Sequence, residues 1–124
     1  MSGNHNQEVG RAGETAACEY LSKRGYQIVE RNFNDIQWGE LDIIAIKDKT
    51  LIFVEVKSRL SNQYGNPEEA VTKHKLSSLK RTANFYVMKH PYYPTLLRID
   101  VVAVILDHKT LTPLSFDLFI DATT

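Results

Sequence analysis

Apolar positions recur along this chain with two different periods, and the periods predict two helices and five strands. From residue 7 to about 24, apolar or small side chains recur at steps of three and four, the spacing of one helix face. Gly25 is well placed to end this helix as its C′ residue. A second helix is predicted over residues 73–89, with Thr72 as its N-cap.

Strand-like segments fill most of the remaining chain. They cover residues 26–33, two runs around 39–45 and 51–57, residues 97–106 and residues 114–120. The predicted order is therefore αβββαββ, and 124 residues suffice for a single α/β domain. The domain is expected to span the whole chain, with residues 1–6 flexible.

Three charged side chains interrupt the second and third strand segments. Asp42, Glu55 and Lys57 lie in sequence that otherwise has the composition of buried β-sheet. Ionised groups are costly to remove from water unless they are paired or bind a metal. The two acids therefore predict a site for a divalent cation.

The polar break at residues 47–50 predicts a β-hairpin between these strands. With a two-residue loop (48 and 49), or with a four-residue loop, Asp42 faces Glu55. Facing residues have Cβ atoms about 4.5–5.5 Å apart, and facing like charges destabilise a sheet unless something neutralises them. A loop of odd length would send the two acids to opposite faces. The metal hypothesis thus depends on the hairpin register.

The same register makes Glu40 face Lys57. A purely structural alternative is therefore a cross-strand Glu40–Lys57 ion pair, with Asp42 at an exposed end of the sheet.

In the metal hypothesis, Mg²⁺ binds oxygen ligands and keeps several waters. Asp42 and Glu55 suit it, with the Val56 carbonyl as a third ligand. Lys57 would then orient or deprotonate the attacking water and stabilise charge on phosphorus.

Glu14 is a candidate fourth acidic residue. It follows Gly10 and Gly13, and each glycine costs a helix about 0.8–1.0 kcal/mol relative to alanine. Such a cost suggests that the helix closely approaches a sheet or a ligand. Glu14 could then bind the ion directly, through water or through a second ion. The alternative is an ordinary glutamate that faces solvent.

Other polar residues have two interpretations each. Lys73 and Lys75 begin the second helix, where they either bind phosphate or form an ordinary charged helix start. Arg98 and Asp100 either help to shape the site or pair with each other. Three tyrosines in predicted loops could stack on bases, although loop tyrosines are common: Tyr64, Tyr92 and Tyr93.

Composition indicates the cellular compartment in which this chain is expected, but it does not identify a binding partner. Net charge is zero, but residues 57–98 carry eight basic and two acidic side chains, which form either a basic binding face or a solvated helix surface. Cys18 is the only cysteine, which excludes a disulfide framework and fits a cytoplasmic setting. No secretory signal and no apolar run of about 18 residues is present, so no membrane partner is expected.

The ordered set of these residues resembles a known group of enzymes. Glu14, Gly39-Glu40-Leu41-Asp42, Phe53-Val54-Glu55-Val56-Lys57-Ser58-Arg59 and the lysines at 73 and 75 resemble the PD-(D/E)xK nuclease superfamily. More narrowly, the chain resembles the YraN-like family of predicted bacterial endonucleases, which is similar to archaeal Holliday-junction resolvases. The resemblance covers nearly the whole chain. Leu41 stands where the motif has proline, a backbone preference rather than a ligand.

The resemblance implies a restriction-endonuclease-like core, with a mixed five-stranded sheet flanked by helices. It implies metal binding by Asp42 and Glu55, a catalytic Lys57 and an accessory acidic role for Glu14. Further expected contributors are an accessory Glu40 and the substrate-binding Lys73, Lys75 and Arg59.

The leading hypothesis is a Mg²⁺-dependent endodeoxyribonuclease, with Mn²⁺ able to substitute, that acts on branched or structured DNA. Symmetric cleavage of a junction would need two active sites, which favours a homodimer. A helicase or recombination factor is a possible further partner. The alternatives are a non-catalytic DNA-binding or adaptor protein that retains the nuclease fold, and a protein-interaction module.

Overall fold

A computed structural model describes residues 2–123, and describes side chains from residue 5 onward. The elements appear in the predicted order αβββαββ, with one short 3₁₀ turn, η1, added. Within residues 2–123, no helix combines the length and apolar content needed to cross a membrane. The elements are α1 (Ser2–Ser22), β1 (Gln27–Asp35), β2 (Gly39–Lys47), β3 (Thr50–Leu60), η1 (Pro67–Ala70), α2 (Lys73–Lys89), β4 (Leu97–Leu106) and β5 (Pro113–Phe119).

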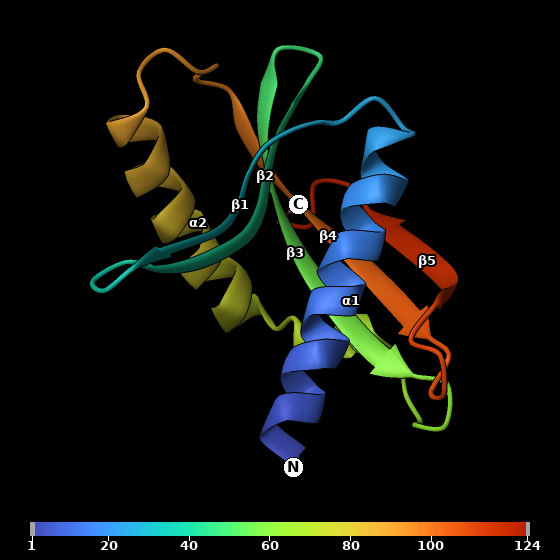
Figure 1. Ribbon diagram of the computed structural model, residues 1–124. Helices are drawn as coiled ribbons and strands as arrows, with labels where there is room; N and C mark the ends of the chain where they lie inside the picture. The colour runs from blue at the N-terminus through green and yellow to red at the C-terminus, as the bar shows by residue number, and fades with distance from the viewer. Residues whose placement is uncertain (1, 124) are drawn as a thin grey trace.

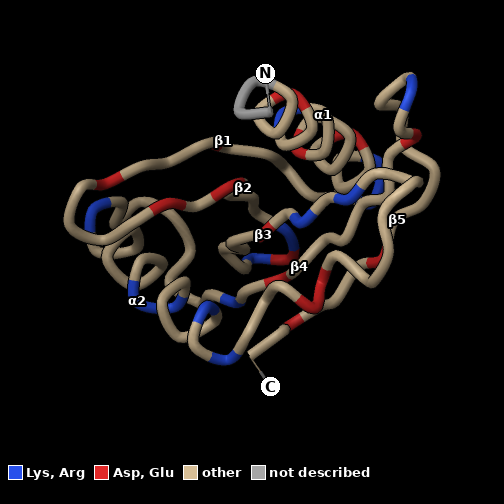
Figure 2. The backbone as a smooth tube through the Cα atoms, turned by 90° about the horizontal axis from the view of Figure 1, so that it is seen from below, with Lys and Arg blue, Asp and Glu red and all other residues tan. Residues whose placement is uncertain are grey.

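The five strands form one mixed sheet in the order β1-β2-β3-β4-β5 (Figure 1). Neighbouring strands are antiparallel except β3 and β4, which are parallel and are connected through η1 and α2. Viewed along the sheet, α1 lies on one face and α2 on the other (Figure 2). The predicted mixed five-stranded sheet flanked by helices is therefore confirmed.

Each face of the sheet has its own apolar core. On the α1 face, Ala17 and Leu21 pack on alternate residues of the central strands, including Val54 and Val102. On the α2 face, Leu79 and Tyr86 are buried in a second cluster. Because β3 and β4 are covered on both faces, their sequences are almost continuously apolar, as expected for buried parallel strands.

The C-terminal end of α1 and the N-cap of α2 agree closely with their predictions from the sequence. Gly25 has φ +88°, the Gly25 N–H donates to the Ser22 carbonyl and the Tyr26 N–H donates to the Leu21 carbonyl. These are the two hydrogen bonds of a Schellman motif, and they place glycine at C′. At α2, the Thr72 hydroxyl accepts from the Lys75 N–H at 3.2 Å, which confirms the N-cap.

The start of α1 differs from the sequence prediction. The helix begins at Ser2, before the predicted start near residue 7. Residue 1 lies outside the described residues, and the flexibility expected for residues 1–6 stays a prediction.

The β2–β3 hairpin has the two-residue loop that the metal hypothesis requires. Asp48 and Lys49 have φ of 50° and 60°, as a type I′ turn demands. The hydrogen-bonded register runs from Lys47 opposite Thr50 to Ile43 opposite Val54. This register is the one that directs the next pair of residues, both acids, toward each other.

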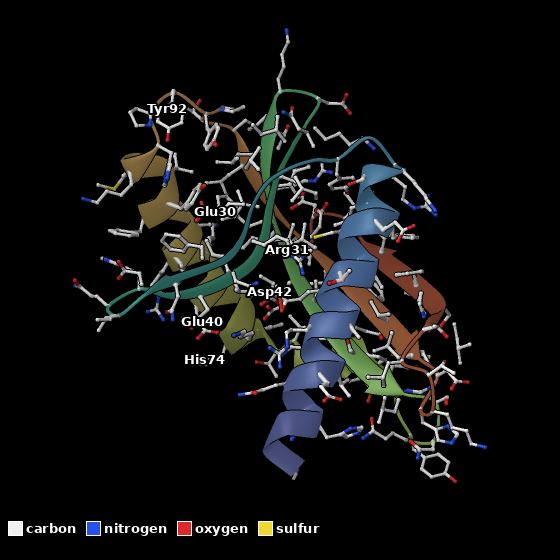
Figure 3. The ribbon with its side chains drawn as sticks, in the orientation of Figure 1. Glu30, Arg31, Glu40, Asp42, His74 and Tyr92 are labelled. Carbon is white, nitrogen blue, oxygen red and sulfur yellow. The ribbon has the colours of Figure 1, made fainter. Side chains whose placement is uncertain are left out.

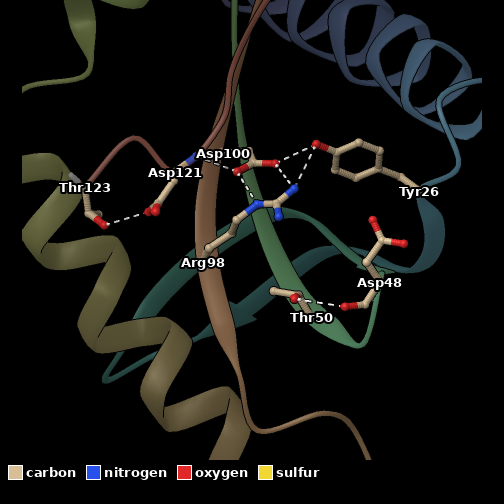
Figure 4. Close-up of polar contacts among 7 residues, drawn as sticks. All are labelled: Tyr26, Asp48, Thr50, Arg98, Asp100, Asp121 and Thr123. Atoms are coloured by element: carbon tan, nitrogen blue, oxygen red, sulfur yellow. Dashed lines mark hydrogen bonds and ion pairs between the residues drawn. The ribbon is translucent and has the colours of Figure 1, made fainter.

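Arg98 and Asp100 form a buried polar cluster with Tyr26 (Figure 4). Asp100 is fully buried, and it accepts from the Tyr26 hydroxyl at 2.7 Å and from the Arg98 Nε at 3.0 Å. It also accepts from the backbone N–H of Asp121 at 2.9 Å, which fastens the end of the chain to β4. Burial, followed by the hydrogen bond to Asp100, raises the pKa of Tyr26 to about 12. The pairing alternative for Arg98 and Asp100 is thus the one observed.

Candidate active site

The candidate site lies where β2 and β3 separate. Their backbone pairing ends at Ile43 and Val54, immediately before the two acids. Beyond this point, the Asp42 carboxylate accepts the Val56 N–H at 2.8 Å. A side-chain oxygen therefore takes the place of a strand carbonyl, so the strands can diverge without leaving that buried donor unpaired. The fork that results holds both carboxylates.

Glu55 is the most perturbed acid in this fork. Its side chain is only 5% exposed, and burial raises its pKa to about 8, with further contributions from a hydrogen bond to Asp42 and from the Asp42 charge. Lys75 Nζ lies 3.5 Å from Glu55 Oε2 and opposes the shift, as does Lys57. Oε2 is nevertheless buried without a hydrogen-bond partner among the described residues. One oxygen of this carboxyl group is therefore available to a ligand.

Glu14 reaches the same fork from α1 because the helix packs very closely on β3. A Cβ built on Gly13 would collide with the Ser58 hydroxyl and lie 3.0 Å from Ser58 Cβ, so only glycine permits this approach. The Glu14 Oε1 atom is buried without a hydrogen-bond partner in the described structure. Burial, then the charge of Asp42, raises the pKa of Glu14, while Arg31 lowers it. The predicted close approach is confirmed at Gly13, whereas Gly10 faces open space.

A polar cleft of about 370 Å³ joins these side chains. Figure 3 shows Asp42 between β2 and α1, with Glu40 farther along β2 toward the β1–β2 turn. The two helices contribute from opposite faces of the sheet: Glu14 comes from α1, and Lys75 comes from the first turn of α2. The lining includes all four predicted catalytic residues, namely Glu14, Asp42, Glu55 and Lys57, together with Glu40, Val56 and Lys75.

Two predicted substrate-binding residues do not line this cleft. Arg59 donates to the carbonyl oxygens of Leu60, Gln63 and Gly65, so its guanidinium organises the loop after β3. Lys73 is exposed and lies outside the lining. No ion pair joins Glu40 to Lys57 among the described residues, because β2 and β3 have separated before they reach these positions.

Sequence reasoning missed several cleft residues. His5, Asn6 and Gly10 line the cleft from α1, and Ser58 and Gln63 line it from the end of β3 and the loop after it. Asn6, Gly10 and Glu14 follow one another at four-residue steps, so helical spacing alone marks them as one face. Nothing in the sequence indicates that the loop after β3 turns back to the cleft.

A divalent cation fits the donors of this fork. Two buried carboxylate oxygens, Glu14 Oε1 and Glu55 Oε2, lack hydrogen-bond partners among the described residues. Burial, and after it the charge of Asp42, raises the pKa of both groups. A cation relieves both costs. Among the described residues, no three His, Cys, Asp or Glu side chains form a complete ligand group. This arrangement suits Mg²⁺, which binds through one or two carboxylates and otherwise uses water and substrate oxygens.

A more spacious groove of about 770 Å³ lies between α1 and the β4–β5 turn. Its exposed lining surface is mainly apolar and includes the stacked rings of Tyr20 and Phe116, and it contains none of the predicted site residues. The chemistry of this chain is therefore concentrated in the smaller, polar cleft.

The mixed five-stranded sheet flanked by two helices, in the order αβββαββ, defines an α/β domain and is consistent with a nuclease-like core. The family model described as "Uncharacterised protein family UPF0102" matches residues 13–104, which contain all four predicted catalytic residues. The chain therefore belongs to the UPF0102 family, the YraN-like group, as its motif residues predicted.

Individual relatives support this membership along most of the chain. A UPF0102 protein of Syntrophomonas wolfei is 44% identical over 102 residues, which are 82% of this chain and 88% of the relative. One from Clostridium botulinum is 42% identical over 82% of this chain and 83% of the relative. One from Persephonella marina is 38% identical over 88% of this chain and 93% of the relative.

Proposed function

We propose that this protein is a divalent-metal-dependent endonuclease that hydrolyses phosphodiester bonds in DNA, preferentially in branched or structured DNA. The observation that carries the proposal is the meeting of Asp42 and Glu55 in one cleft with Lys57. Carboxylate pairs with an adjacent ammonium suit phosphodiester hydrolysis, because the reaction needs a bound cation and a further positive charge near phosphorus. The preference for branched DNA comes from the resemblance to Holliday-junction resolvases.

Each residue of the fork has a role in this proposal. Asp42, Glu55 and the Val56 carbonyl would hold Mg²⁺ or Mn²⁺, and Glu14 would bind it directly or through water. When bound, the ion would stabilise the negative charge that develops on the phosphate during attack by water. Lys57 would orient the attacking water or, as the neutral amine, accept a proton from it, and in its ammonium form it would stabilise charge on phosphorus.

Lys75 would change partner during binding. In the present structure its Nζ lies 3.5 Å from Glu55 Oε2. A cation on Glu55 would repel this ammonium, which lies at the N-terminus of α2, where a phosphate is also attracted. Lys75 is thus positioned to move from the carboxylate to the substrate.

Cleavage assays test the proposal. The purified full chain is incubated with Mg²⁺ or Mn²⁺ and labelled junction, flap, single-stranded and linear duplex DNA. We expect cleavage of the branched substrates, abolished by EDTA and reduced at least about a hundredfold in Asp42→Asn and Lys57→Met, as for loss of a major electrostatic contributor. Lys73→Met removes an exposed ammonium outside the cleft and should retain most of the activity.

Two results would contradict this function. Cleavage that persists in both Asp42→Asn and Lys57→Met would assign the activity to another site or to a contaminant. Tight DNA binding without cleavage, across all metals and substrates, would instead favour a non-catalytic DNA-binding protein with this fold.

A further inference from the structure

The β1–β2 turn exposes apolar side chains at a rigid, protruding tip. Ile36 is completely exposed and Trp38 is 39% exposed. The Asp35 carboxylate accepts from the N–H groups of Gln37 at 2.9 Å and Trp38 at 3.0 Å, which fixes the turn between them. The tip is therefore preorganised, and its apolar side chains face water at a cost that a partner would remove.

The tip is fastened to α2. The Trp38 carbonyl accepts from the buried Thr82 hydroxyl, and Gly39 adopts φ +107° against the same residue. The Trp38 indole stacks on Phe85, with ring centroids 5.4 Å apart and planes 17° apart. The exposed Met88 follows Phe85 by three residues, so it lies on the same side of the helix. Together, Ile36, Trp38, Phe85 and Met88 form what we call the hairpin patch.

Positive charge borders the hairpin patch. Lys89 Nζ lies 5.6 Å from the Phe85 ring centroid, and Arg81 precedes Phe85 by one helical turn. Figure 2 shows basic positions recurring along α2. Aromatic rings beside Lys and Arg are the combination that binds single-stranded nucleic acid, since rings stack on bases while cations contact phosphates. This complementarity favours a nucleic acid over a protein partner.

The hairpin that carries the patch also borders the acidic cleft, because Glu40 and Asp42 of β2 line that cleft. A hollow of about 190 Å³ contains Glu40 and Asp42, which it shares with the cleft, and extends along Asn32–Asn34 of β1. Three residue steps along β2 lead from Gly39 at the turn to Asp42. At about 3.3 Å per residue, this is about 10 Å along the strand.

We propose that the hairpin patch binds the unpaired bases at a branch in nucleic acid, with Ile36 placed against the last base pair and Trp38 and Phe85 beside the displaced base. This inference rests on the proposed nuclease function and names the feature of the substrate that the enzyme selects. It also predicts that cleavage occurs close to the branch point, because the same hairpin carries Asp42.

Trp38 is the only tryptophan in the chain, so its fluorescence reports directly on the patch. The full-length protein is titrated, in EDTA to prevent cleavage, with a forked DNA and with a blunt duplex of equal length. We expect the forked DNA to quench the fluorescence of Trp38 and to bind the protein at least about fivefold more tightly than the duplex does. Ile36→Ser should remove most of this preference without changing duplex affinity. Leu114→Ser, an equally conservative change at an exposed position on β5, should change neither.

Each outcome supports or overturns the inference separately from the catalytic proposal. Fork-specific quenching that Ile36→Ser abolishes supports it, even if no substrate is cleaved with Mg²⁺, a result that would refute nuclease activity alone. The inference is overturned if wild type and Ile36→Ser bind the forked DNA with equal affinity, or if the forked DNA and the duplex quench Trp38 equally. A patch that binds protein instead would give no quenching with either DNA, which also overturns it.

Discussion

Replacing Glu55 by glutamine should stabilise the metal-free protein while destroying its metal site. Glu55 is buried beside Asp42, and its pKa is raised from 4.5 to about 8. In the unfolded chain the group ionises near its ordinary pKa, so between pH 4.5 and 8 the folded state holds more protons than the unfolded state. Stability must therefore fall as pH rises through this interval. Glutamine has the shape of the protonated acid and does not titrate.

The magnitude follows from the same pKa values. A solution pH of 7 is about 2.5 units above the pKa of Glu55 in the unfolded chain, where the group is ionised, whereas the folded group remains mostly protonated. Each pH unit of this difference corresponds to about 1.4 kcal/mol. This linkage costs the wild type about 3 kcal/mol at pH 7. We therefore expect Glu55→Gln to raise the free energy of unfolding by about 1–3 kcal/mol.

Urea denaturation in EDTA, followed by circular dichroism between pH 5.5 and 8.5, measures this difference. Wild type should lose stability across the range, whereas Glu55→Gln should vary much less. Adding Mn²⁺ should stabilise wild type and have little effect on Glu55→Gln, because a ligand stabilises only the state that binds it. Glu8→Gln, an exposed change on α1, is the matched control and should behave as wild type. A variant no more stable than wild type at pH 7, together with a flat wild-type pH profile, would refute the reasoning.

Three further changes test separate parts of the structure. Asp42→Asn removes the charge beside Glu55 and should lower the pKa of Glu55, which NMR titration of its side-chain carboxyl carbon measures; an unchanged pKa would show that burial alone sets it. Gly13→Ala should lower the free energy of unfolding by about 1–3 kcal/mol because its Cβ collides with Ser58, whereas Gly10→Ala, which faces open space, should raise it by about 0.5–1 kcal/mol. Equal effects of the two changes in urea denaturation would contradict the close approach of α1 to β3. Tyr26→Phe deprives the buried Asp100 of a donor and should cost about 1–3 kcal/mol in thermal or urea unfolding; a metal affinity that also changes would contradict its purely structural role.

Much of this fold follows from local rules. Thr72, Gly25 and the polar break before Thr50 are sufficient to set helix ends and a hairpin turn, because capping and turn geometry depend on residues only a few positions apart. The even loop then fixes which side chains of β2 and β3 face one another, since alternation along a strand has period two. For this reason the meeting of Asp42 with Glu55 was predictable from the sequence.

Contacts between distant segments were decided only by tertiary packing. The fork between β2 and β3 depends on the Asp42 carboxylate capturing the Val56 N–H, and no period in the sequence encodes that bond. Glu40 and Lys57 belong to the predicted register but separate because the ladder stops before them. Arg59 was expected to face substrate, yet the loop that follows it supplies three carbonyl acceptors.

By itself, the sequence determined the elements, the hairpin register and the acids that meet in it, because each depends on neighbours along the chain. Only the tertiary structure decided that α1 brings Glu14 and α2 brings Lys75 to one cleft from opposite faces of the sheet. It alone also anchored the β1–β2 turn on α2 through Thr82 and Phe85. These contacts join residues 20 or more positions apart, and the packing of whole elements, rather than any local pattern, determines their geometry.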